Sequence, residues 1–351
     1  MPSGHTKLTQ RRMIVLVVAL LLTFAGAIAS AMAGQLPASW TEVIGTVLHS
    51  AGFNTGWRPN DELIEQTLLQ IRFPRVAMSL LVGAALAIAG AVMQSIFGNP
   101  LAEPGVVGVS SGAALGAALA IAIGMTTFGG WSIAVMAFLG GFLSTVLVYA
   151  TARSQGRTEV VTLLLTGIAI NAFAGAGLAL MMFSGGAAAR EQIVFWQLGS
   201  INGSRWSEVF IVLVLTVPAM VWVSLMARQY DVLALGERSA AHLGLNVERL
   251  RVISIVLVAL LTAAGVAFVG IIAFVGLVVP HVIRMLLGPG HRWLLPLSAL
   301  MGALLLVWAD LFARTILDGS DLPIGMLTSL IGGPFFFYLV RSARSRAGGW
   351  A

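Results

Sequence analysis

Two arginines, Arg72 and Arg75, stand three residues apart where a long apolar run begins. On a helix this spacing places both side chains on one face. Planar guanidinium groups pair bidentately with carboxylates, so the two together suit the capture of an acidic partner. Basic side chains at the end of an apolar helix also snorkel toward water and lipid head groups. The two residues therefore predict either an acid-binding surface or a pair of interfacial anchors.

Three polar residues lie inside apolar runs, namely Gln94, Asn171 and Asp310. Polar groups inside a membrane are energetically expensive and mark functional positions in many transporters. Asp310 precedes Arg314 by four residues, which predicts an ion pair along one helix. Gln94 and Asn171 fit two interpretations equally, because a side-chain amide either lines a polar path or bonds a neighbouring helix.

The sequence lacks the residue constellations of an enzyme or a metal site. It has no cysteines and five histidines, and no two histidines have metal-ligand spacing. His281 follows Pro280, and we interpret it as a structural histidine rather than a ligand of a bound group. A Gly-x-x-x-x-Gly-Lys-Ser/Thr phosphate loop is also missing, so the chain is not itself an ATPase. We expect a protein that is not an enzyme and that binds no metal or cofactor of its own.

The composition predicts an all-α polytopic membrane protein. The chain is 58% hydrophobic and 10% charged, against roughly 25% charged residues in soluble domains. Its apolar runs are long and unbroken, whereas the strands of a membrane β-barrel alternate over about ten residues. The excess of Lys and Arg over Asp and Glu fits basic loops at an anionic membrane surface and gives no reason to expect nucleic acid.

Ten apolar runs approach the length of about 20 residues that spans a membrane. They lie near residues 13–33, 73–97, 106–123, 131–151, 160–183, 207–227, 252–272, 274–287, 294–314 and 324–341. The runs at 106–123 and 274–287 are short and Gly-rich, which is typical of interior or broken helices. The Pro/Gly-rich break at 98–105 is tolerated at membrane depth only inside protein or beside a water-filled cavity. It therefore suggests a path through the bilayer.

The basic residues give an orientation. Of the 20 Lys and Arg residues, fourteen fall on the side that carries both termini, so we expect that side to be cytoplasmic. The first run also resembles a signal peptide, because Ala31-Met32-Ala33 is a small-residue cleavage motif. The run is longer than a signal core, so we favour a retained helix. The longest non-membrane stretches, 34–71, 184–206 and 228–250, are too short for a soluble domain.

Ordered motifs cover the chain from Arg72 onward. They are RFPR at 72–75, NPLAEPG at 99–105, LLLTG at 163–167, FWQLGS at 195–200, LALGE at 233–237, AAHLG at 240–244, FVGLVVPH at 274–281 and LPIG at 322–325. Together they closely resemble the permease subunits of ATP-binding-cassette (ABC) importers for vitamin B12, ferric siderophores and haem. The resemblance implies a type II ABC importer permease fold, with residues 1–351 forming a single transmembrane permease domain.

The resemblance also implies the partners. It suggests a second copy of the chain, two cytoplasmic ATPase subunits that bind ATP and Mg, and an extracytoplasmic substrate-binding protein. The location would be the cytoplasmic (inner) membrane of a bacterium, in contact with lipid. Cargo would pass by alternating access between the two copies, with no cofactor bound by this chain.

Residue roles are carried over from the family onto matching positions. The arginines expected to dock glutamates of the binding protein are Arg72, Arg75 and Arg314. The ATPase-coupling segment, at about 231–250, includes Leu235, Gly236, Glu237, Arg238, Ala240, Ala241, His242, Leu243 and Gly244. The expected cytoplasmic gate is Thr158, Glu159, Val160 and Val161. The residues expected along the translocation pathway are Gln94, Asn99, Asn171, Met181, Phe195 and Trp196.

Haem is the favoured cargo. The stretches at 195–200, 288–292 and 332–334 look closest to the haem branch, with ferric siderophore second and cobalamin third. Two functions of other classes compete with import. An ion-coupled secondary transporter needs intramembrane carboxylates, and only Asp310 is available. An intramembrane enzyme needs a catalytic constellation, and none is found in the predicted spans.

Overall fold

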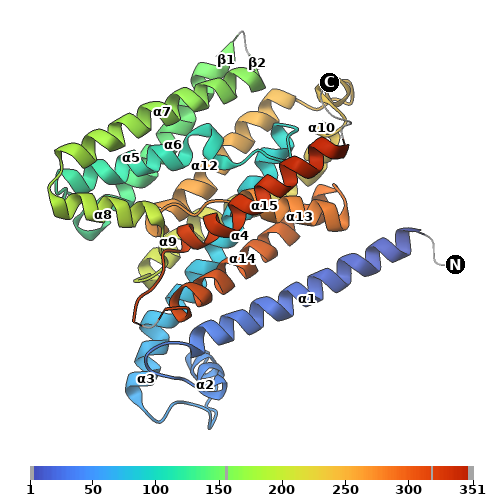
Figure 1. Cartoon of the computed structure of the whole chain (residues 1–351). Coiled ribbons are helices and arrows are strands. Elements are labelled where there is room, and N and C mark those ends of the chain that lie inside the picture. The colour runs from blue at the N-terminus through green and yellow to red at the C-terminus, as the bar shows by residue number, and fades with distance from the viewer. Residues whose placement is uncertain (1–3, 155–156, 318, 347–351) are drawn as a thin grey trace.

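The structure, a computed structural model, describes residues 4–154, 157–317 and 319–346 of the chain. This part of the chain is almost entirely helical (Figure 1). Seven of its helices are long and apolar enough to cross a membrane, and three shorter apolar helices accompany them. The predicted all-α polytopic fold with about ten membrane helices is thus confirmed.

The elements follow one another along the chain with short connections. In order they are α1 (Gly4–Met32), α2 (Trp40–Ser50), α3 (Glu62–Thr67), the π-helical turn η1 (Leu68–Arg72), α4 (Phe73–Ile96), η2 (Pro104–Val107), α5 (Val109–Ala122), η3 (Gly129–Trp131), α6 (Ser132–Ala152), β1 (Arg153–Ser154), β2 (Arg157–Thr158), α7 (Val160–Ser184), α8 (Ala187–Leu198), α9 (Trp206–Leu225), α10 (Ala227–Leu233), α11 (Glu237–His242), α12 (Val247–Val269), α13 (Val275–Leu287), α14 (His291–Thr315) and α15 (Ile324–Arg346). The two short strands pair antiparallel, with Arg153 opposite Thr158.

Helix α4 lies at the centre of the bundle and contacts α9, α12, α13 and α14. Its small residues let these neighbours approach closely, as is common between membrane helices. A Cβ atom added to Gly83 would lie 2.3 Å from the carbonyl oxygen of Gly302 in α14. One added to Gly90 would lie only 1.8 Å from the carbonyl oxygen of Gly276 in α13. The glycines of α4 therefore set the spacing of the core.

We expect Gly90→Ala to destabilise the protein by about 3 kcal/mol, because α4 and α13 must separate to admit the methyl group. The matched control is Gly175→Ala in α7, where the added Cβ meets open space. That change is expected to be neutral or stabilising by about 0.5–1 kcal/mol. Thermal unfolding of both variants in detergent checks the prediction, and equal melting temperatures would contradict it.

Two irregular segments enter the bundle, as the short Gly-rich runs predicted. Residues 97–108 pass through η2 and reach α5 with Gly108 in the left-handed conformation, at φ 81°. Residues 270–274 lead into α13 and end at Phe274. Its φ of 67° is the one positive value at a non-glycine position in the described residues. Both segments are followed by short, largely buried helices, so α5 and α13 are interior elements.

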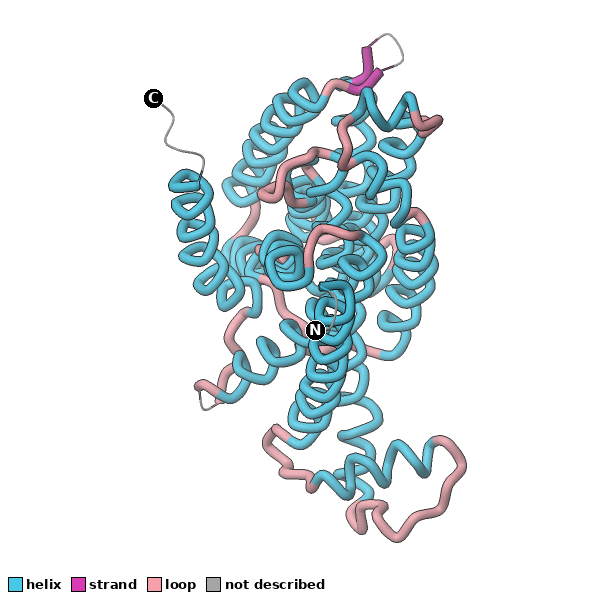
Figure 2. The backbone as a smooth tube through the Cα atoms, turned by 90° about the vertical axis from the view of Figure 1, so that its right-hand side faces the viewer, coloured by secondary structure: helices cyan, strands magenta, loops and turns pink. Residues whose placement is uncertain are grey.

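Helices α2 and α3 form a small lobe beyond one end of the bundle (Figure 2). The stretch 34–71 was expected to lie outside the membrane, and no helix was predicted in it. Its signal was present, because Ser39 and Glu42 form a reciprocal capping box at the start of α2. Such a Ser-x-x-Glu pattern marks a helix start. Helices α10 and α11 lie at the other end of the bundle (Figure 1).

Candidate transport and coupling sites

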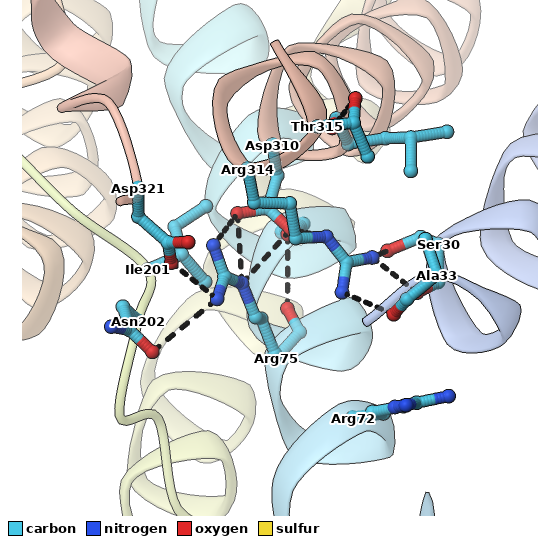
Figure 3. A network of polar contacts seen from close by, with 12 residues as sticks. Ser30, Ala33, Arg72, Arg75, Ile201, Asn202, Asp310, Arg314, Thr315 and Asp321 are labelled. Carbon is cyan, nitrogen blue, oxygen red and sulfur yellow. Dashed lines mark hydrogen bonds and ion pairs between the residues drawn. The ribbon is translucent and has the colours of Figure 1, made fainter. Parts of the chain in front are cut away.

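The three arginines predicted to dock a partner do gather at one end of the bundle, but their side chains are enclosed by acceptors of their own chain (Figure 3). Arg72 donates from Nη1 to the carbonyl oxygens of Ala31 and Met32, at 2.8 and 3.0 Å, and from Nη2 to that of Leu36. The carbonyls at a helix C-terminus lack partners within the helix. Arg72 thus caps the end of α1.

Arg75 is the centre of an ion-pair network. Its Nη2 lies 2.9 Å from Asp310 Oδ1, and its Nε donates to both carboxylate oxygens of Asp310 at 3.0 and 3.1 Å. Its Nη1 donates to Asp321 Oδ2 at 2.8 Å and to Asn202 Oδ1 at 3.3 Å. The network joins α4 to α14 and to the loops that precede α9 and α15 (Figure 3).

The expected pair between Asp310 and Arg314 is present but secondary, at 3.8 Å between Nε and Oδ2. Arg314 instead donates to the carbonyl oxygens of Ser30 and Ala33 at the end of α1. All three guanidinium groups are thus bonded within their own chain, and their role in docking the binding protein stays a prediction. These contacts make the end of α1, including the small-residue motif, part of the folded domain.

A cavity of about 440 Å³ lies between α5, α7 and α8. Asn171 lines it and accepts a hydrogen bond from Ser111 Oγ at 2.5 Å, while its Nδ2 donates to the carbonyl oxygen of Gly105 at 3.3 Å. Glu103, which the sequence analysis passed over, lines the same cavity. The cavity is a polar site beside the middle of α7.

The other predicted pathway residues do not line this cavity. Gln94 bonds helices, since its Nε2 donates to the carbonyl oxygen of Leu277 at 3.1 Å and its Oε1 accepts from Arg284 at 2.6 Å. Asn99 is exposed and bonds the backbone N–H of Leu101. The remaining three lie around α8, where Met181 and Trp196 pack against Ile193 and Phe195 is exposed. The structure therefore brings only Asn171 to the polar cavity.

The predicted gate segment is tied to α12. Thr158 donates to Glu248 from its backbone N–H at 3.0 Å and from Oγ1 at 2.5 Å. Glu159 is exposed and accepts a hydrogen bond from Thr162 Oγ1 at 3.0 Å. Val160 lines a second cavity of about 440 Å³, and Val161 is exposed. The four residues run from the end of β2 into the first turn of α7, and their role as a gate stays a prediction.

The predicted coupling segment forms a short helix with one buried and one open side. Helix α11 is bracketed by Gly236, at φ 98°, and Gly244, at φ 84°, and both values favour glycine. Ala240 is fully buried, whereas Leu235 and Leu243 are 64% and 65% exposed. The other members of the predicted set, Glu237, Arg238, Ala241 and His242, are also exposed.

Two histidines of α13 and α14 differ in their hydrogen bonding. His291 lies 2.7 Å from Asp231 Oδ1 through Nδ1 and 2.5 Å from Ser95 Oγ through Nε2. His281 Nδ1 is buried without a hydrogen-bond partner among the described residues. No cluster of three or more metal-ligating side chains occurs in the part of the chain that the structure describes.

Comparison with known proteins decides the family. The FecCD transport family matches residues 17–342. The chain belongs to the FecCD transport family. It is 40% identical over 304 residues to the hemin transport system permease protein of Yersinia pestis, covering 86% of this chain and 91% of that protein. It is also 40% identical over 316 residues to the cobalamin import system permease protein of Halobacterium salinarum, covering 90% of this chain and 82% of that protein.

A solved structure supports the same fold. It is reported as an inward-facing conformation of a transporter assigned to the metal-chelate ABC type. The TM-score is 0.81 at 31% identity, and the match covers 93% of this chain and 99% of that one. This FecCD permease is therefore a multi-pass transport subunit of an ABC transporter.

Proposed function

We propose that this FecCD permease carries haem across the cytoplasmic membrane of a bacterium as part of an ATP-driven importer. The similarity to the hemin permease of Yersinia pestis, over most of both chains, is the observation that supports this cargo. The chain supplies no metal-ligand cluster within its described residues. This fits transport of an intact complex, because conduction needs cargo binding weak enough to permit release.

The assembly that we propose has two copies of this chain, two ATPase subunits and an external binding protein. Helix α7 leaves a broad apolar face uncovered, including Leu165, Phe173 and Phe183. The outer part of α15 likewise exposes Leu330 and Ile331. A second copy that packs on these helices would enclose the polar cavity beside α7. We place both termini, the gate segment and α11 on the cytoplasmic side, where the ATPases bind.

Uptake by the reconstituted importer tests the cargo. The permease, its ATPase and the binding protein from the same gene cluster are placed in liposomes with internal ATP. We expect haem to accumulate, and a non-hydrolysable ATP analogue to prevent it. Accumulation of a ferric siderophore or cobalamin without haem would overturn the cargo and retain the importer. Transport driven by an ion gradient without the ATPase would overturn the importer itself.

We retain a docking role for the outer arginines in a modified form. Arg75 is bound by Asp310, which is fully buried, and by Asp321, which is 32% exposed. An acidic residue of the binding protein can therefore compete with Asp321 for one edge of the guanidinium group. Asp310 would hold the other edge in place during this exchange.

Asp321→Asn is expected to raise the affinity of the permease for the binding protein several-fold, because it removes the competing carboxylate. Arg75→Gln is expected to weaken binding at least tenfold. Arg205→Gln serves as the control, since Arg205 is exposed near the same loop. Surface plasmon resonance on the assembled importer measures all three. Unchanged affinity in both Asp321→Asn and Arg75→Gln would remove docking from this network.

A further inference from the structure

One buried arginine joins the coupling segment to the gate segment. Arg251, on the first turns of α12, is only 4% exposed. Its Nη2 donates to Glu237 Oε1 at 2.5 Å, at the first residue of α11. Its Nη1 donates to the backbone carbonyl oxygen of Thr158 at 2.9 Å, immediately before α7. A single planar group thus contacts two segments that are far apart in sequence.

The carboxylate of Glu248 belongs to the same network and contacts both Arg251 and Thr158. Glu248 lies one helical turn before Arg251, and the two groups are 4.0 Å apart. It accepts hydrogen bonds from the backbone and side chain of Thr158 and, at 3.0 Å, from Tyr149 Oη in α6. Thr158, two residues before the start of α7, is consequently held to α12 through both its backbone N–H and its backbone carbonyl group.

The chemistry makes the two contacts of Arg251 depend on each other. A buried guanidinium group that loses its acceptors costs several kcal/mol in general. Glu237 is 59% exposed, so it lies at the surface where an ATPase would contact α11. Displacement of α11 therefore either removes an acceptor from Arg251 or moves the guanidinium group. In the second case the Thr158 carbonyl, and with it the start of α7, is displaced.

We propose that Arg251 is a positioning residue that transmits movement of α11 to the start of α7. The proposal rests on the proposed function, because it takes α11 as the contact with the ATPase. Arg251 touches neither cargo nor nucleotide. Its role is to keep the distance between Glu237 and Thr158 fixed while the ATPases open and close.

The variants are chosen to separate this role from a purely structural one. Arg251→Met removes the charge and keeps most of the apolar volume, and water can solvate the carboxylates left behind, because Glu237 and Glu248 are 59% and 23% exposed. Arg251→Lys retains a charge but lacks the planar fork that reaches two acceptors. Glu237→Ala removes the α11 end of the link. Arg249→Met is the matched control, since Arg249 is an exposed arginine on the same turn of α12.

The measurement is the amount of cargo taken up per ATP hydrolysed in liposomes, together with copurification of the ATPase. We expect Arg251→Met to retain the ATPase and its hydrolysis while uptake per ATP falls at least tenfold. Arg251→Lys should give an intermediate value, and Arg249→Met the wild-type value. The double variant Arg251→Met/Glu237→Ala should be no worse than Arg251→Met alone, because both changes break one link.

An unchanged ratio in Arg251→Met, or losses that multiply in the double variant, would overturn the role of Arg251. A loss of uptake in exact proportion to lost hydrolysis would also overturn it, because that result indicates a structural defect. The proposed function itself is tested separately, by measuring transport by the wild-type protein. A wild-type chain that transports without any ATPase subunit would refute the importer before any variant is tested.

Discussion

Asp310→Ala is expected to lower the free energy of unfolding of the permease by about 3–5 kcal/mol. Asp310 is completely buried and is the main partner of Arg75, with Arg314 beside it. Without this carboxylate, two buried guanidinium groups lie close together and repel each other. The change should lower the melting temperature in detergent and the yield of folded protein.

Asp321→Asn is the control for this prediction. Asp321 binds the same guanidinium group at 2.8 Å but is 32% exposed, so water replaces part of its contribution. We expect a loss of less than about 1 kcal/mol, as for other solvent-accessible ion pairs. Equal melting temperatures for Asp310→Ala and Asp321→Asn would show that burial does not decide the strength of these pairs.

The membrane helices could be predicted from sequence because their signal is local. A run of about 20 apolar residues is sufficient evidence for a spanning helix, and Gly83 and Gly90 mark the close contacts that membrane helices favour. The short runs that became α5 and α13 were likewise predicted as interior helices. Helices α2 and α3 were not, since the capping box at Ser39 was the main local signal in that polar stretch.

The partners of the charged residues could not be predicted in the same way. Asp310 has a basic residue four positions away, and helical spacing alone selects Arg314. The closer partner is Arg75, which is 235 positions away in sequence. The link from Arg251 to Thr158 spans 93 positions. Such pairs depend on which helices pack together, and a single sequence does not contain that information.

The residues predicted to bind partner proteins differ in their solvent exposure. A residue that binds a partner protein has to be accessible, and the outer arginines are mostly enclosed by their own chain. The coupling segment meets this requirement. Leu235 and Leu243 lie on either side of α11 and are both about two-thirds exposed, at 64% and 65%. The exposure of both leucines makes this segment accessible to a partner protein.

Leu243→Asp is therefore expected to reduce copurification of the ATPase at least tenfold, and ATP-driven uptake with it. A charge at this position must be desolvated when the ATPase binds, and that desolvation is costly unless the charge is paired. Ala241→Glu adds a charge and bulk to the same exposed side and should have a similar effect. The melting temperature of the isolated permease should stay within a degree or so of wild type, because exposed residues contribute little to packing.

Leu63→Asp is the matched control, because Leu63 is 58% exposed on α3, at the opposite end of the bundle. It places the same charge on an apolar side chain of similar exposure, and we expect the ATPase to copurify normally. The comparison distinguishes a contact at α11 from a general effect of added charge. Normal copurification and uptake in both Leu243→Asp and Ala241→Glu would refute α11 as the ATPase contact. Since Glu237 begins this helix, that result would also remove the basis for transmission through Arg251.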